Sequence, residues 1–298
     1  MASYKIRKRM YINDAARIDG RVVIVTGCNT GIGKATVHEL AKRGGKIYMA
    51  SRNEEATLQS LNKIKESTKN EQLYFLKLDL ASLDSVRDFC EKFQTLESRL
   101  DILINNAGVL APFNRTTDGF ELNFGVNHLG HFLLTNLLLD SLKTGAPSRI
   151  IIVSSALHEY ANINRDDINC ERDFPGTFKA YENSKLCNIL FMRELSKRLE
   201  GTGVVCNALS PFLSDTDATR YLNSIQRFFF DILKKSFFYN SPEIGCQPIV
   251  MLAVEPSLSD VTGKYYVQFK VKEPTLRKQN YESWLWEKSE EMTKIFGK

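Results

Sequence analysis

The chain has 298 residues, of which 43% are apolar and 25% are charged, and it carries a formal net charge of +5. This composition is typical of a soluble globular protein with ample core, and the dispersed Lys and Arg argue against a nucleic-acid partner. No stretch reaches the roughly 18 uninterrupted apolar residues expected of a membrane-spanning helix. The six cysteines form no Cys-x-x-Cys pair, so we expect reduced thiols inside a cell rather than a zinc or redox motif.

Residues 1–19 are predicted to be a basic N-terminal extension, with a cluster at Lys5, Arg7, Lys8 and Arg9. We interpret this cluster as part of a solvated tail, with contact to phosphate or to an anionic membrane surface as the alternative. No apolar run follows the cluster, so no secretory signal is expected.

Residues 20–298 alternate short β-rich runs with amphipathic stretches, which predicts a single α/β domain built from βαβ units around a parallel sheet. Strands are expected at Val22–Thr26, Lys46–Ala50, Leu73–Leu80, Asp101–Asn105, Arg149–Ser154, Val204–Leu209 and Lys264–Val267. One helix is expected from Gly33 to about Arg43, closed by Gly44 and Gly45. Other helices are expected to start near Glu54, Ser82, Thr117 and Phe178.

A glycine-rich turn, Thr26-Gly27-Cys28-Asn29-Thr30-Gly31-Ile32-Gly33, follows the first strand and opens the first helix. Its bare backbone allows a pyrophosphate to approach the positive end of the helix, which predicts a dinucleotide site. A nucleoside-triphosphate loop is excluded because it needs glycine at Cys28 and a hydroxyl at Ala35. The alternative is a turn that only lets the helix pack against the sheet.

The end of the second strand indicates which dinucleotide is preferred. An NAD site typically has an acidic residue there to hold the ribose hydroxyls, whereas this chain has Ala50-Ser51-Arg52-Asn53. An arginine suits a 2′-phosphate through paired, charge-assisted hydrogen bonds, so NADP(H) is favoured over NAD(H). The alternative is that Arg52 is a solvated surface residue.

The sequence Tyr181-Glu-Asn-Ser-Lys185 places a phenol and an ammonium four residues apart in a predicted helix, and therefore on one helical face. At roughly 4 Å and an effective dielectric near 20, the ammonium would favour the phenolate by about 4 kcal/mol, or about three pKa units. That would bring the pKa of Tyr181 toward neutrality, where a phenol can exchange protons with an alcohol or a ketone. A half-buried Tyr beside a Lys that extends to solvent is the alternative for the pair alone.

Further motifs follow the remaining strands, and together they resemble the short-chain dehydrogenase/reductase family. They are the Thr26 to Gly33 turn, Asp79 after the third strand, Asn105-Asn106-Ala107-Gly108 after the fourth, Asn127, Ser155, and Tyr181-x-x-x-Lys185. The resemblance spans nearly everything after Asp19. Similarity to the retinol dehydrogenase branch rests on residues 29–34, residues 127–132, the long interval from Ser155 to Tyr181, and Ser241-Pro242-Glu243.

The resemblance implies a single-domain Rossmann fold with a doubly wound, mostly parallel sheet of about seven strands, ordered 3-2-1-4-5-6-7, and helices on both faces. It also implies that Tyr181 is the general acid or base and that Lys185 lowers its pKa and holds the nicotinamide ribose. Ser155 is expected to hydrogen-bond the substrate oxygen. Asn127 is expected to position a water that links Lys185 to solvent.

The expected cofactor-binding residues are Gly27, Asn29, Thr30, Gly31, Ile32, Gly33, Arg52, Asp79, Leu80, Asn106, Ala107, Gly108, Tyr181, Lys185 and Thr216. For Asp79 a turn-forming role is the alternative. No metal is expected, because His128 and His131 are three residues apart without a third ligand of suitable spacing.

The chain departs from the family pattern after the sixth strand. The family usually carries Pro-Gly there, then a threonine four residues beyond the glycine that helps to hold the nicotinamide amide. This chain has Pro211-Phe212 and retains Thr216. If the role of the glycine depends on a positive φ, Phe212 would strain or reshape the loop and alter nicotinamide placement.

The segment of about residues 212–240 is rich in Phe, Leu and Ile between positions 221 and 239. We expect it to be a lid over a large apolar substrate. Its Arg227, Lys234 and Lys235 would also suit contact with an anionic membrane. A helix buried against the core or a partner subunit is the alternative.

We therefore expect an enzyme that uses NADP(H) to interconvert a lipophilic alcohol and its aldehyde or ketone, with a retinoid as the leading candidate and Tyr181 as general acid/base. The alternative is a catalytically impaired dinucleotide-binding sensor or scaffold, which Phe212 favours and the retained catalytic residues oppose. The expected location is intracellular, either cytoplasmic or peripheral to the endoplasmic reticulum or another lipid surface. A homodimer and peripheral membrane contact are left open.

Overall fold

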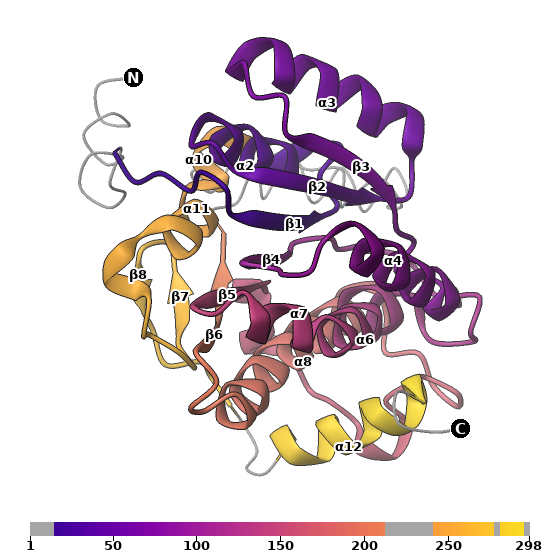
Figure 1. Ribbon diagram of the computed structural model, residues 1–298. Helices are drawn as coiled ribbons and strands as arrows, with labels where there is room; N and C mark the ends of the chain where they lie inside the picture. Colours follow the sequence, from indigo (N-terminus) through magenta and orange to yellow (C-terminus); the bar gives the residue numbers. More distant parts are fainter. Residues whose placement is uncertain (1–14, 212–240, 277–280, 295–298) are drawn as a thin grey trace.

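The computed structural model describes residues 15–211, 241–276 and 281–294, which are arranged as shown in Figure 1. One sheet of eight strands lies at the centre, in the order β3-β2-β1-β4-β5-β6-β7-β8. The strands are β1 Val22–Thr26, β2 Lys46–Ser51, β3 Leu73–Lys77, β4 Ile102–Asn105, β5 Ser148–Val153, β6 Val204–Ser210, β7 Tyr265–Val267 and β8 Lys270–Val271. The predicted order of seven parallel strands is confirmed, and the short β8 adds an antiparallel edge.

Helices cover both faces of this sheet (Figure 1). One face packs against α2 Gly31–Lys42, α3 Glu54–Thr68 and α11 Gln247–Val254. The other packs against α4 Leu83–Leu96, α6 Gly130–Leu137 and α8 Thr177–Arg198. The remaining helical elements are α5 Leu122–Phe124, the π-helix η1 Gly125–Leu129, α7 Leu139–Thr144, η2 Ala156–Tyr160, η3 Arg165–Asp167, α10 Pro242–Gly245, η5 Pro256–Leu258 and α12 Tyr281–Thr293.

The strands separate two cores because successive side chains point to opposite faces. In β1, Val22 and Ile24 join the core beneath α4, α6 and α8, whereas Val23 and Val25 join the core beneath α2 and α11. A strand that is buried on both faces reads as a continuous apolar run, which is how β1 could be predicted with its observed bounds.

Helix termini follow the local capping chemistry that the sequence predicts. The Ser82 hydroxyl accepts a hydrogen bond from the Ser85 amide at 3.2 Å and begins α4. The Asn53 side chain accepts from the Ala56 amide at 3.0 Å and begins α3. After α2, Gly44 has a φ of +86°, a conformation that glycine adopts without steric cost.

Two predicted boundaries are wrong by three residues or more, and the others agree within two residues. No helix begins near Thr117, because residues 116–119 form a turn in which Gly119 has a φ of +85°. The helical segment begins at Leu122, where the Glu121 carboxylate accepts hydrogen bonds from the amides of Asn123 and Phe124 at 3.0 and 2.8 Å. The third strand ends at Lys77 rather than at residue 80, since the chain turns away at Asp79.

The strand order reverses at β1, which has β2 on one side and β4 on the other. In open α/β sheets, the carboxyl ends of the strands at such a reversal diverge and leave a crevice where ligands bind. In the described ranges, no helix combines the length and apolar character needed to cross a membrane.

Candidate active site

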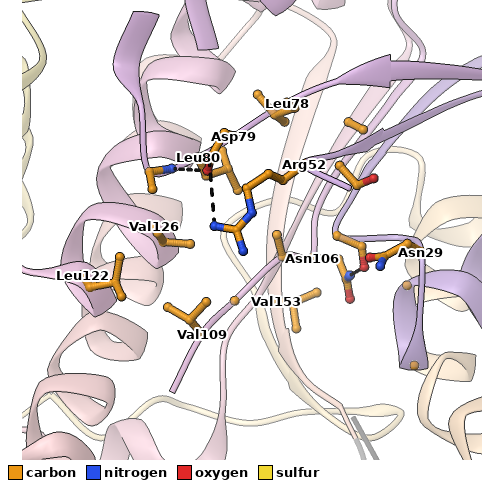
Figure 2. Close-up of a pocket in the computed structure, with 18 of the residues that line it drawn as sticks. Asn29, Arg52, Leu78, Asp79, Leu80, Asn106, Val109, Leu122, Val126 and Val153 are labelled. Atoms are coloured by element: carbon orange, nitrogen blue, oxygen red, sulfur yellow. Dashed lines mark hydrogen bonds and ion pairs between the residues drawn. The ribbon is translucent and has the colours of Figure 1, made fainter. Parts of the chain in front are cut away.

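A cavity of about 760 Å³ lies at this reversal of strand order. Figure 2 shows Asn29, Arg52, Leu80 and Asn106 around it, contributed by segments that follow four different strands. Fourteen of the fifteen expected cofactor-binding residues line the cavity: Gly27, Asn29, Thr30, Gly31, Ile32, Gly33, Arg52, Asp79, Leu80, Asn106, Ala107, Gly108, Tyr181 and Lys185. Thr216, Phe212 and the predicted lid lie outside the described residues.

The amino end of α2 has the features of an anion-binding helix terminus. Thr30 precedes the helix without a side-chain capping bond, and the first turn holds no acidic residue. The first backbone N–H groups of a helix lack partners within it, and its dipole favours a negative charge at this end. Gly27 and Gly31 have φ values of +63° and +54°, so the turn that leads into the helix depends on glycine.

Close packing explains the last glycine of the turn. A Cβ at Gly33 would collide with the Gly27 carbonyl oxygen and would lie 2.6 Å from Nδ2 of Asn106. The same Nδ2 donates to the carbonyl oxygens of Thr26 and Gly27 at 2.8 and 3.2 Å. The glycine turn and the loop after β4 therefore form one rigid wall of the cavity.

Arg52 and Asp79 form an ion pair at the part of the cavity that lies beyond β2 and β3. Figure 2 shows the guanidinium directed toward the carboxylate. Their Nη1 and Oδ2 atoms are 4.0 Å apart. The other carboxylate oxygen of Asp79 accepts a hydrogen bond from the Ala81 amide at 3.0 Å. Asp79 therefore forms a turn, as the alternative interpretation predicted, and also lines the cavity. Its contact with a cofactor stays a prediction.

Tyr181 and Lys185 lie on α8 and both line the cavity. The Lys185 ammonium lies 5.6 Å from the centre of the Tyr181 ring and donates a hydrogen bond to the Val153 carbonyl oxygen at 3.1 Å. Burial lowers the pKa of Lys185 to about 8. Ser155 begins η2, immediately beside the cavity-lining Ser154, and contacts Tyr181 through a side-chain hydrogen bond.

The pKa of Tyr181 differs from the sequence-based expectation. Burial raises the pKa of its phenol to about 12, and the hydrogen bond with Ser155 opposes this rise. Lys185 does not lower this pKa toward neutrality, because its ammonium is held at the Val153 carbonyl and is itself buried. In this state of the site, the phenol is protonated at neutral pH.

Asn127 does not line the cavity, but its side chain is hydrogen-bonded to the main chain of Val109, which does. It lies fully buried in the π-helix η1. Its side chain accepts from the Val109 amide at 2.7 Å and donates to the Val109 carbonyl and the Ser184 hydroxyl, both at 2.9 Å. A Cβ at Gly108 would lie 3.2 Å from Nζ of Lys185 and 3.4 Å from Oδ1 of Asn127, so both side chains approach the loop after β4.

His128 and His131 lie three residues apart on η1 and α6. The described residues contain no group of three or more His, Cys, Asp or Glu side chains that could hold a metal ion. Both His128 and His131 are buried, and burial lowers the pKa of each, to about 3 and about 4 respectively. The Lys185 charge also lowers the pKa of His131.

These two histidines predict a fall in stability on acidification. The unfolded chain binds protons near pH 6.5, whereas the folded protein does so only near pH 4 or below, so stability present above pH 6.5 is lost as the pH falls. We expect the free energy of unfolding in urea to decrease by roughly 2 kcal/mol per histidine between pH 7 and pH 5. The His128→Gln variant should show a decrease that is smaller by roughly 2 kcal/mol, and an undiminished decrease would contradict this assignment.

Several cavity residues were not predicted from the sequence. They are Ala50, Ser51, Asn53, Leu78, Ala81, Val109, Asn114, Arg115, Thr116, Thr117, Leu122, Val126, Val153, Ser154 and Pro211. Most lie at the end of a predicted strand or just after a predicted strand or motif, which is where the rule that ligands bind beyond the carboxyl ends of parallel strands points. Leu122 and Val126 had no such signal because the helix start was misplaced.

Comparison with known proteins identifies the family. Residues 21–227 match the family model for short chain dehydrogenase. The chain is 49% identical over 263 residues to retinol dehydrogenase 13 of Homo sapiens, covering 87% of this chain and 80% of that protein. It is 41% identical over 297 residues to retinol dehydrogenase 14 of Mus musculus, covering 95% and 88%.

Solved structures agree on the fold. An uncharacterized protein from Mycobacterium Paratuberculosis has a TM-score of 0.76 at 31% sequence identity, covering 94% of this chain and 96% of that chain. The RhlG/NADP complex of Pseudomonas aeruginosa has a TM-score of 0.69 at 22% identity, covering 86% and 97%.

The chain therefore belongs to the short-chain dehydrogenase family and is an oxidoreductase. Within that family it is retinol dehydrogenase-like, as the relatives at 41% and 49% identity demonstrate. The predicted family and branch are confirmed.

Proposed function

We propose that this chain uses NADP(H) to interconvert a lipophilic alcohol and its aldehyde or ketone. The observation that carries the proposal is that Tyr181 and Lys185 line the same cavity as the glycine turn and Arg52. The groups that would transfer a proton and the helix terminus that would bind phosphate therefore border the same cavity. The nicotinamide dinucleotide would supply the hydride.

Tyr181 acts as the general acid that protonates the substrate oxygen in the reducing direction and as the base in the oxidising direction. Ser155 hydrogen-bonds the same oxygen and stabilises the charge that develops on it. Lys185 places a buried ammonium near the Tyr181 ring and holds the nicotinamide ribose. The phenol is protonated at neutral pH, which is the form that a general acid needs in the reducing direction.

The glycine turn and the uncapped end of α2 fit the pyrophosphate of a dinucleotide. Arg52 fits a 2′-phosphate, because its guanidinium lies at the cavity and its side chain is 54% exposed. Asp79 holds that guanidinium at 4.0 Å, which keeps the positive charge directed toward the cavity.

The Arg52→Asp variant tests this cofactor preference. We expect the dissociation constant for NADPH to rise by about tenfold to a hundredfold, because charge-assisted hydrogen bonds to a phosphate are lost. The constant for NADH should change little. Lys63→Asp is the matched control, since it reverses a charge on the exposed side of α3 without touching the cavity. Equal weakening of both cofactors in Arg52→Asp would contradict the preference for NADP.

Two findings support a lipophilic substrate. Relatives that share 41% and 49% of their aligned residues with this chain are named retinol dehydrogenases, so a retinoid is the leading candidate. In addition, the half-exposed Phe113 precedes the cavity-lining Asn114, and its ring lies 5.1 Å from the ring of Phe174. These rings would offer an apolar rim to an incoming substrate.

Steady-state NADPH consumption tests the proposed function. The purified chain would be assayed against all-trans-retinal and against steroid and aliphatic carbonyls, with NADH in a parallel series. We expect turnover that prefers NADPH and is fastest with one lipophilic carbonyl class. NADPH binding without turnover on any carbonyl would favour the alternative of a dinucleotide-binding sensor or scaffold.

We further propose that residues 20–298 act as one catalytic domain and that residues 212–240 form its substrate lid. The lid and the basic cluster within residues 1–19 lie outside the described residues. Flotation with anionic and neutral vesicles tests peripheral membrane contact, and light scattering tests for a homodimer. Binding that is lost when Arg227, Lys234 and Lys235 are replaced with alanine would support lid contact with the membrane, and unchanged binding would contradict it.

A further inference from the structure

His131 lies at the centre of a hydrogen-bonded chain that joins Asn127, the end of β1 and the loop after β4. It is on α6, only 2% exposed, and does not line the cavity. Its Nδ1 lies 3.1 Å from the main-chain oxygen of Asn127, and its Nε2 lies 2.9 Å from the hydroxyl of Thr26. Thr26 is the last residue of β1 and the first residue of the glycine turn.

The partners of His131 determine its tautomer. A carbonyl oxygen can only accept, so the Asn127 contact requires a proton on Nδ1. Burial favours the neutral ring, which leaves Nε2 without a proton and able to accept from the Thr26 hydroxyl. The Ile104 carbonyl is a competing acceptor for that hydroxyl but is more distant, at 3.4 Å.

Thr26 connects His131 to the loop after β4 through hydrogen bonds. Its hydroxyl oxygen accepts hydrogen bonds from the amides of Asn106 and Ala107, each at 2.9 Å. With its proton directed to His131, the hydroxyl uses one donor and two acceptor positions, which is its full capacity. Asn106 and Ala107 both line the cavity. The tautomer of His131 therefore affects the position of residues in the wall where we place the cofactor.

We propose that His131 is a positioning residue, fixed as the Nδ1–H tautomer, that holds the glycine-turn strand, the loop after β4 and the main chain of Asn127 in one register for dinucleotide binding. This proposal rests on the proposed function, because it takes the segments that His131 holds together to be a binding site for a dinucleotide. No step of the chemistry passes through His131. Its effect is exerted through Thr26 and Asn127.

His128 provides an internal comparison three residues away. Its Nε2 lies 2.8 Å from the Ser289 hydroxyl, which already donates its proton to the Leu285 carbonyl at 2.7 Å. His128 must therefore donate from Nε2, so it is the opposite tautomer. It joins α12 to η1 and does not itself line the cavity.

The first test is the nitrogen NMR spectrum of the full chain labelled with ¹⁵N in histidine, at neutral pH and without cofactor. Assignment by single His→Gln variants of the four histidines allows each ring to be read separately. The protonated nitrogen should be Nδ1 in His131 and Nε2 in His128. A proton on Nε2 of His131 would overturn the proposal whatever the enzyme proves to catalyse.

The second test measures NADPH affinity by fluorescence titration in His131→Phe, His131→Gln and His128→Phe. We expect His131→Phe to weaken NADPH binding about tenfold, the value of one lost hydrogen bond. His131→Gln should recover most of the affinity, since its side-chain oxygen can accept from Thr26. His128→Phe replaces an equally buried imidazole with a phenyl ring. It should lower the melting temperature without changing the dissociation constant for NADPH.

The outcomes separate this proposal from the proposed function. No NADPH binding by the native chain would overturn the proposed function. Normal binding by the native chain and unchanged binding by His131→Phe would overturn only the role of His131. An equal loss of affinity in His128→Phe would also overturn it, because the effect would then be general destabilisation.

Discussion

Replacing Tyr181 with phenylalanine is expected to lower kcat/KM for carbonyl reduction by about a thousandfold. The change removes the phenol oxygen and keeps the aromatic ring, which lines the cavity near Lys185. Loss of a positioned general acid leaves the substrate oxygen to take its proton from water, which is slower by this order. The dissociation constant for NADPH should remain within a few fold of the native value, because the glycine turn and Arg52 are untouched.

Tyr160→Phe is the matched control for this variant. Tyr160 ends η2, is 58% exposed and does not line the cavity. It should retain native kcat/KM. Turnover by Tyr181→Phe at more than about a tenth of the native rate would contradict the assignment of Tyr181 as general acid.

Replacing Gly33 with alanine is expected to weaken NADPH binding by about a hundredfold or more and to lower the free energy of unfolding by about 2 to 3 kcal/mol. The added methyl would collide with the Gly27 carbonyl oxygen and would crowd Nδ2 of Asn106. Neither neighbour can retreat freely, because Nδ2 is held by the carbonyl oxygens of Thr26 and Gly27. The turn must therefore open at the point where we place the pyrophosphate.

Gly201→Ala separates this effect from the general cost of replacing a glycine. Gly201 has a φ of +78°, with no atom within 4 Å of an added Cβ, and does not line the cavity. Alanine there should cost about 1 kcal/mol of stability through backbone strain alone and leave NADPH affinity unchanged. Native affinity in Gly33→Ala, measured by isothermal titration calorimetry, would contradict the proposed phosphate site.

The sheet was predictable because its signals are local and mutually consistent. Residues 22–25 are all apolar and are followed by Thr26 and a glycine, which identifies both the strand and its end. The start near Thr117 was misplaced because Glu121 is not among the usual capping residues, although its carboxylate accepts two amide hydrogen bonds here. The two-residue β8 is too short to give a periodic pattern.

Much of the candidate site could be predicted by motif, whereas its electrostatics could not. The spacing of Tyr181 and Lys185 places them on one helical face, but it does not reveal that the Val153 carbonyl holds the ammonium. Burial therefore dominates the pKa of both groups. The link from His131 to Thr26 joins residues about 100 positions apart in the chain, which periodicity cannot report.

The most direct test of the proposed function is a single turnover with NADPH deuterated at the transferable position of its nicotinamide C4. The native chain would be mixed with all-trans-retinal, and the alcohol formed would be analysed by mass spectrometry. Direct transfer within the cavity predicts one deuterium on the carbinol carbon, with none formed by Tyr181→Phe on the same timescale. Alcohol without deuterium, or no alcohol from retinal or any other carbonyl despite bound NADPH, would contradict the proposed reductase.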